Sequence, residues 1–233
     1  MDYEVKVAAG QLFLMSRELS EQDKEDVLNS QLFAHLYASS KADKFCEMYR
    51  WDYHLNIALQ QSKFITTSTL ASQTKLLADN NVSVGALIIQ GLAVAKVSEA
   101  QSNAVLNALS LLAKHPVAHQ VFYRAVMNDA PLCFPKAYGP TTCISLSVSL
   151  VEAQAQLITV SLQLVVRSTF NHDLISKEFL GEEVTGPMLS AVSWSELLCT
   201  QYGEVRKKIL DMVEAKREAL IVNVDAAPPI GLV

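Results

Sequence analysis

The sequence is poor in charge, glycine and proline. Only 18% of its 233 residues are charged, the formal net charge is −5, and 50% are hydrophobic. Such a chain carries no basic footprint for nucleic acid and no polybasic patch for anionic lipid, so we expect no nucleic-acid partner. Eight glycines and seven prolines are few, which favours long regular elements, and the apolar content excludes a disordered chain.

Cysteine is also scarce and widely spaced. No two of the four cysteines have the CxxC spacing of a metal or redox site, and a disulfide framework is not expected with so few in a chain of this size. We therefore expect reduced thiols and synthesis in the cytoplasm. The start, "MDYEVKVAAG", has acids where a signal peptide needs basic residues, so release from the cell would use a non-classical route.

The stretch "CISLSVSLVEAQAQLITVSLQLVV", residues 143–166, has one charge in its whole length. Its polar residues follow helical spacing and form one narrow stripe, which predicts a buried helix over 141–168. The stripe consists of Ser145, Ser149, Glu152, Gln156, Thr159, Gln163 and Arg167. The alternation of apolar residues with serines predicts instead a strand hairpin at 144–166. We place that reading second because the turn has no Gly, Asn or Pro.

Residues 83–114 show a similar stripe and predict the second long apolar helix. The sequence thus predicts a mainly α fold, one compact helical domain over 1–233, in which these two helices pack at the centre. Outer helices are expected at 21–38, with Ser20 as N-cap, and at 41–63 and 189–219. A polar helix is expected over 66–78. "YEVKVA" and "LIVNV" have strand character and allow a short terminal strand pair.

The two apolar stretches share an "EAQ" motif. They read "SEAQSNAVLNALSLL" at 98–112 and "VEAQAQLITVSLQLV" at 151–165. Over about 83–113 and 140–166 the chain resembles the R-body or "killing trait" helical proteins of bacteria, whose alanine-rich helices have glutamine-containing centres. That resemblance implies a helical, non-enzymatic, self-assembling protein tied to bacterial killing or virulence. It transfers no site residues.

Three cysteines are candidates for a reactive or acylated thiol. Cys143 follows "YGPTT" at an expected loop-to-helix junction, where a helix N-terminus would lower the thiol pKa. Cys133 lies in a proline-rich loop, and Cys199 lies on an expected helix in "WSELLCTQY". A nucleophilic role requires a base within hydrogen-bond reach, such as a histidine. A thiol in an apolar groove could instead carry a covalently bound fatty acyl chain.

Other motifs do not point to catalysis. "HPVAH" gives His115 and His119 the spacing of a helical zinc site, but Pro116 favours a helix start with His115 at the cap, so no metal and no cofactor is expected. No phosphate-binding, nucleophile-elbow or metalloprotease motif occurs. We expect a virulence- or toxin-type protein that acts by self-assembly, partner binding or membrane interaction. The alternative is thiol-dependent acyl transfer or hydrolysis, or an acylated cysteine.

Overall fold

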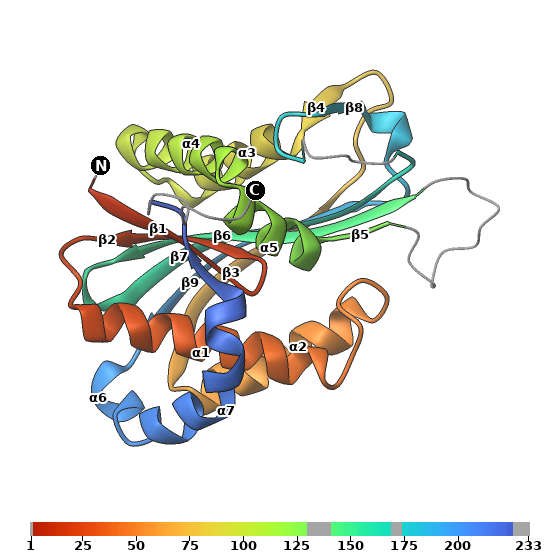
Figure 1. Ribbon diagram of the computed structural model, residues 1–233. Helices are drawn as coiled ribbons and strands as arrows, with labels where there is room; N and C mark the ends of the chain where they lie inside the picture. Colours follow the sequence, from red (N-terminus) through yellow and green to blue (C-terminus); the bar gives the residue numbers. More distant parts are fainter. Residues whose placement is uncertain (1, 130–140, 169–173, 226–233) are drawn as a thin grey trace.

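A mixed β-sheet lies between two layers of helices in the computed structural model, which describes residues 2–129, 141–168 and 174–225 (Figure 1). The sheet has the strand order β10-β1-β2-β6-β7-β9-β3, and β5 adds to β6. Its strands are β1 (Tyr3–Ala8), β2 (Gln11–Ser16), β3 (Phe64–Thr74), β5 (Met127–Asp129), β6 (Thr142–Glu152), β7 (Gln156–Val166), β9 (Met188–Leu197) and β10 (Ile221–Asn223). Of these pairs, β2 with β6 is parallel and the others are antiparallel.

The helices cover both faces of the sheet (Figure 1). The first layer consists of α3 (Val84–Ala95), α4 (Glu99–Lys114) and α5 (Pro116–Val126). The second consists of α1 (Glu21–Ser39), α2 (Met48–Gln61), α6 (Cys199–Tyr202) and α7 (Arg206–Leu220). A small separate sheet pairs β4 (Asn81–Ser83) with β8 (Glu178–Leu180). Each helical layer has its own apolar core against the sheet.

The mainly α prediction is wrong, and the error lies at residues 141–168. These residues form the hairpin β6–β7, which is the alternative reading of the sequence. The turn is the short 3₁₀ element Ala153–Ala155, where Gln154 and Ala155 adopt left-handed backbone conformations with φ of 62° and 55°. Glycine or asparagine normally takes that conformation, so no residue at this turn signals it.

Four residues of the predicted polar stripe, Ser145, Ser149, Thr159 and Gln163, lie on one face of this hairpin, while Glu152 and Gln156 lie on the other face beside the turn. Along β6 the side chains alternate, and Ile144, Leu146, Val148 and Leu150 enter the core beneath α3–α5. Ser147 faces Ser161 and Ser149 faces Thr159 across the two strands, with hydroxyl–hydroxyl distances of 2.9 and 2.6 Å. A strand period of two therefore explains both sets of residues.

Residues 83–114 are helical but not one helix. Lys96 ends α3 in a left-handed conformation, and Ser98 with Gln101 forms a capping box that starts α4. Since residues 98–112 are helical and 151–165 form strands, the two stretches are not copies of one helical unit, and the resemblance to R-body proteins is wrong. The expected helix at 66–78 is likewise wrong, because residues 64–74 form β3.

Other elements follow the sequence closely. Helix α1 begins at Glu21 and is capped by Ser20, whose hydroxyl accepts from the Asp23 backbone N–H, as predicted. The terminal strand pair is confirmed, since β1 pairs with β10. The outer helices expected at 41–63 and 189–219 correspond to α2 and α7. In the second range only the later part is α7, because residues 189–197 belong to the long strand β9.

Candidate functional site

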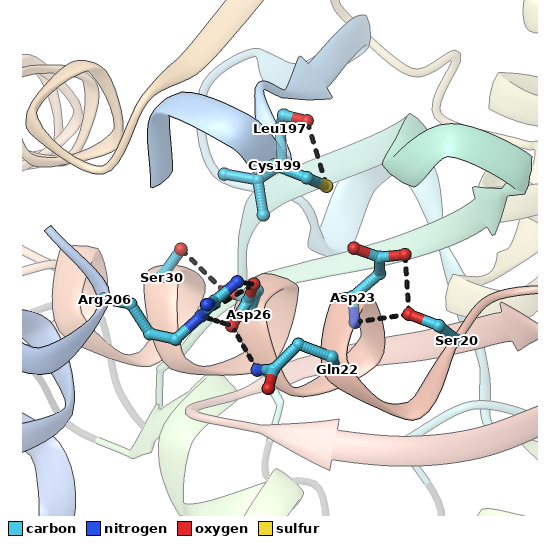
Figure 2. A network of polar contacts seen from close by, with 8 residues as sticks. All are labelled: Ser20, Gln22, Asp23, Asp26, Ser30, Leu197, Cys199 and Arg206. Atoms are coloured by element: carbon cyan, nitrogen blue, oxygen red, sulfur yellow. Dashed lines mark hydrogen bonds and ion pairs between the residues drawn. The ribbon is translucent and has the colours of Figure 1, made fainter. Parts of the chain in front are cut away.

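Cys199 is a described cysteine that lies beside polar groups. It begins the short helix α6 directly after β9, and its sulfur lies between the Leu197 carbonyl and the carboxylates of α1 (Figure 2). The thiol donates to the Leu197 carbonyl oxygen at 3.5 Å. The same side chain packs against the core between the sheet and the α1 layer. The position is thus half-buried, between an apolar core and an acidic helix.

This environment holds the Cys199 thiol in its protonated form. Burial raises its pKa to about 12, helped by a hydrogen bond to the Asp23 carboxylate and by the negative charges of Asp23 and Asp26. A thiol is nucleophilic as the thiolate, which is almost absent at neutral pH for such a pKa. The local charge therefore opposes nucleophilic chemistry at Cys199.

The carboxylates near Cys199 bind the last helix to the first. Asp26 is fully buried, and its two oxygens share the Arg206 Nε–H at 2.9 and 3.2 Å, while Oδ2 also accepts from Arg206 Nη2 at 2.6 Å. Gln22 donates to the same carboxylate, and Ser20 donates to Asp23 (Figure 2). Paired, charge-assisted bonds of this geometry fix the position of one helix on another. The network has a structural role, which is to hold α7 on α1.

Cys143 does not lie where the sequence placed it. It is a residue of β6, opposite Val165 of β7 and Asn128 of β5, with 1% of its surface exposed. Burial, followed by the charge of Asp43, raises the pKa of its thiol to about 11. The predicted loop-to-helix junction is wrong, so no helix N-terminus lowers this pKa.

The remaining sequence candidates give no catalytic pair. Cys133 lies outside the described residues, and Cys46 is disulfide-bonded, which corrects the expectation of reduced thiols throughout. His115 caps α5 through its Nδ1 atom with Pro116 as first residue, as predicted. Within residues 2–129, 141–168 and 174–225, no hydrogen bond joins a histidine to Cys143 or Cys199.

The described chain offers neither a metal cluster nor a membrane-spanning helix. In that part of the molecule no group of three or more His, Cys, Asp or Glu side chains is arranged to hold a metal ion. Among its helices, none is both long and apolar enough to cross a membrane.

The long outer strand β3 is the feature that the sequence analysis missed. It pairs with β9 on one side, and in the described chain its other side has no partner. Phe64 is buried, while every other residue of the strand is exposed. After an irregularity between Thr66 and Ser68, the register with β9 is regular over residues 68–74. A straight row of unpaired backbone N–H and C=O groups thus faces solvent at one edge of the sheet.

Apart from the irregularity between Thr66 and Ser68, the features that usually protect such an edge are absent from β3. Edge strands are commonly short, or they carry proline, lysine or another charged residue, which prevents pairing with another chain. The β3 sequence, "FITTSTLASQT", has none of these, and charge resumes only at Lys63 and Lys75 on either side. Its threonines and isoleucine favour the extended conformation, which was the available signal in the sequence.

Exposed apolar side chains gather beside this edge. Ile65 and Leu70 of β3 are 48% and 53% exposed, and Tyr49 and Tyr53 of the adjoining α2 are 70% and 63% exposed. Gln73 of β3 donates to the Tyr49 hydroxyl at 3.2 Å, which ties the start of α2 to the end of β3. We call β3 with these two tyrosines the β3 edge. It combines open hydrogen-bonding groups with apolar surface.

The opposite edge of the sheet is different. Strand β10 has three residues, and both α5 and α7 pack against it. A strand this short and this covered offers little to a partner. The two edges of the sheet are therefore not equivalent.

Comparisons with known proteins give distant likenesses in fold. No protein-family model and no curated protein matches the sequence. The chain is similar to the activated Cyt2Ba monomer from Bacillus thuringiensis subsp. israelensis, with a TM-score of 0.45 and 11% identity over 85% of this chain and 99% of that one. It is similar to a delta-endotoxin, with a TM-score of 0.45 and 10% identity over 82% and 84% of the two chains. It is also similar to the Evf virulence factor, with a TM-score of 0.39 and 10% identity over 88% and 77%.

Two of these proteins are described as a delta-endotoxin and a virulence factor, and none of the three is described as an R-body protein. With TM-scores below 0.5, none of them decides what this chain does. The function has to be argued from the molecule itself.

Proposed function

We propose that this is a non-enzymatic protein of virulence or toxin type that acts by self-assembly. In this proposal two copies pair their β3 strands antiparallel, which joins two sheets into one continuous sheet. The observation that carries the assembly is the open β3 edge, with its exposed, uncharged strand. Backbone hydrogen bonds supply the contact in strand addition, and side chains on both faces of the strand supply the selectivity.

A second copy suits this edge because β3 itself meets the requirements for a partner strand. A partner strand has to be extended, uncharged and of similar length, and β3 has these properties. If the two strands pair about a two-fold axis beside Ala71, residues 68–74 of one copy lie opposite residues 74–68 of the other. Lys63 then lies away from the partner's Lys75, because the register carries it beyond the end of that strand. Each copy also brings its Tyr49, Tyr53 and Leu70 to the junction.

The geometry also limits the size of the assembly. If β3 paired with β10, each copy would keep one open edge and a filament would grow, because such contacts do not close. The three residues of β10 cannot match the 11 of β3, so this contact is disfavoured. Pairing β3 with β3 uses the same surface on both copies and stops at a dimer.

Thiol chemistry is the alternative function, and the protonated state of Cys143 and Cys199 argues against it. The pKa values of Cys143 and Cys199 are raised to about 11 and about 12, and no histidine of the described chain is hydrogen-bonded to either. Intact mass spectrometry with a thiol-reactive probe at pH 7 tests this alternative. We expect slow labelling that becomes fast on unfolding, and a mass without an acyl chain. Rapid labelling of one folded cysteine, or an added acyl mass, would revive it.

The assembly is tested by sedimentation equilibrium at micromolar concentration. The intact protein is expected to be a dimer, and Leu70→Lys is expected to be a monomer, because Lys introduces charge into the edge. Met212→Lys on α7 is the matched control, since Met212 is 47% exposed where Leu70 is 53%, and it should remain a dimer. An intact protein that stays monomeric, or a Leu70→Lys variant that still dimerises, would refute pairing at β3.

The toxin-type role is tested separately on membranes and cells. Dye release from liposomes and viability of cultured cells are measured for the intact protein, Leu70→Lys and Met212→Lys. We expect activity in the intact protein and the control, and its loss in Leu70→Lys. A dimer that is inert in both assays would leave self-assembly in place and remove the toxin-type role.

A further inference from the structure

A cavity of about 440 Å³ lies between the start of β1 and the first half of α4. It is distant from the β3 edge, because four strands, β2, β6, β7 and β9, separate β1 from β3 in the sheet. Its volume is within the range of small-molecule sites, which is roughly 300–1,000 Å³. Neither the thiols nor the assembly surface uses it.

The Glu152 carboxylate fixes two residues of the cavity wall. Glu152, at the end of β6, accepts a hydrogen bond from the Tyr3 hydroxyl and another from Gln101 Nε2, both at 2.7 Å. Gln101 is also fixed through its oxygen, which accepts from the backbone N–H and hydroxyl of Ser98 in the capping box. Tyr3 and Gln101 line the cavity, so part of its wall is preorganised.

The free polar groups of the wall are amides and one carboxylate. Asn103 and Asn107 are exposed, lie one helical turn apart on α4 and line the cavity. Neither side-chain amide is hydrogen-bonded to another residue in the described part of the chain. Asp2 is the charged residue of the lining, which contains no Lys, Arg or His. The site can thus donate and accept several hydrogen bonds, but the described residues of its lining offer no positive charge.

Small apolar residues complete the wall. Ala100 and Ala104 lie on α4 between the polar side chains and leave room for a ring, while Tyr3 adds an aromatic side chain. A ligand that fits has many hydroxyl groups, a partly apolar ring face and no negative charge. An anionic ligand would meet the Asp2 carboxylate without a cation to offset it.

We propose that this cavity binds a neutral sugar. The amides of Asn103 and Asn107 and the carboxylate of Asp2 would bond its hydroxyl groups, and the alanines would contact the ring. The sugar can be free in solution or one residue of a glycan chain, since both present the same chemistry to the site. A methyl glycoside separates these sources, because it blocks the position through which a sugar joins a chain.

The experiment is saturation-transfer NMR of the full chain with a panel of neutral hexoses, their methyl glycosides and glucuronic acid. We expect saturable transfer from at least one neutral hexose and none from glucuronic acid. The Asn103→Ala/Asn107→Ala double variant should weaken binding about tenfold, since each lost amide removes a hydrogen bond. Asn56→Ala is the control, because Asn56 is an exposed asparagine of α2, on the opposite face of the sheet.

Both cavity asparagines are exposed, so the double variant should fold, and an unchanged melting temperature would show this. Weaker binding can then be assigned to the cavity and not to unfolding. Equal binding of the methyl glycoside shows that the site accepts a sugar joined to a chain, and its loss shows that the site requires a free sugar. The proposal is overturned if no neutral hexose gives saturable transfer. It is also overturned if the double variant binds as the intact protein does, or if glucuronic acid binds more tightly.

Discussion

The two helical layers cover the same sheet but are built from different chemistry. Helices α3, α4 and α5 bury apolar side chains, and the one buried polar residue in this layer, His115, is the cap between α4 and α5. Helix α1 alone buries six polar or charged residues, which are Lys24, Asp26, Asn29, Ser30, Gln31 and His35. The first layer is held by non-directional burial, and the second depends on specific pairing and on the charge state of its groups. The two layers should therefore respond differently to mutation and to pH.

The largest expected effect comes from breaking the pair that holds α7 on α1. Arg206→Met keeps the aliphatic stem but leaves the buried Asp26 carboxylate without its partner, so we expect a loss of about 4 kcal/mol in the free energy of unfolding. Asp26→Asn should cost less, because the Arg206 side chain is 38% exposed and can be hydrated. Urea denaturation at pH 7 measures both. Equal losses, or the reverse order, would contradict this account of the network.

The second effect is acid sensitivity confined to the α1 layer. Burial, aided by the charge of Lys44, lowers the pKa of His35 to about 3, from an ordinary value of 6.5. Between these values the unfolded chain binds a proton that the folded chain excludes, so the free energy of unfolding falls as pH decreases. We expect a loss of about 3 kcal/mol between pH 6.5 and 4 from this residue.

His35→Gln cannot titrate and should remove that part of the pH dependence. Urea denaturation of the variant and the intact protein at pH 6.5 and 4 provides the comparison. Parallel pH curves for His35→Gln and the intact protein would show that His35 is not the source.

A core truncation in the α3–α5 layer should be smaller and independent of pH. Val105 of α4 is fully buried in the apolar core, and Val105→Ala should cost about 2 kcal/mol through lost burial and the cavity left behind. No ionisable group is involved, so the loss should be the same at pH 6.5 and 4. A cost that changes with pH would show that the two layers are coupled.

The smallest effect concerns the break between α3 and α4. Ser98→Ala removes the hydroxyl that accepts from the Gln101 backbone N–H at the start of α4, and should cost about 1 kcal/mol. Thermal unfolding followed by circular dichroism at two pH values measures it. Ser110→Ala, an exposed position within α4, is the control and should be neutral. If Ser98→Ala lowers stability no more than Ser110→Ala does, the cap is not needed to start α4.

Local signals in the sequence predicted helix ends better than they predicted the sheet. Ser20 and the acids after it identified the start of α1, and Pro116 identified the start of α5, because capping depends on a few neighbouring residues. The β6–β7 hairpin is the second choice from sequence because Gln154 and Ala155 adopt left-handed backbone conformations that glycine or asparagine usually adopts. The layers on either face also hide the strand pattern, since a sheet covered on both sides buries long apolar runs.

The candidate sites were predictable only in part. Sequence reasoning selected Cys143 and Cys199, but the burial and the α1 carboxylates that shield them come from distant parts of the chain. The β3 edge was not predicted, because whether a strand has one neighbour or two depends on the order of the whole sheet. The cavity unites the first residues of the chain with α4 and with Glu152, and no spacing rule connects these.

The parallel pairing of β2 with β6 has a consequence for how the chain folds. It sets residues 11–15 beside residues 147–151, so more than half of the chain lies between two neighbouring strands. Strands β1 and β2 form a local hairpin, but they reach the centre of the sheet only after that long segment has been organised. Contacts so far apart in sequence slow folding, because the entropy of closing the loop is lost before the pairing is gained. In stopped-flow refolding the β6–β7 hairpin should therefore gain protection from hydrogen exchange before β2 does.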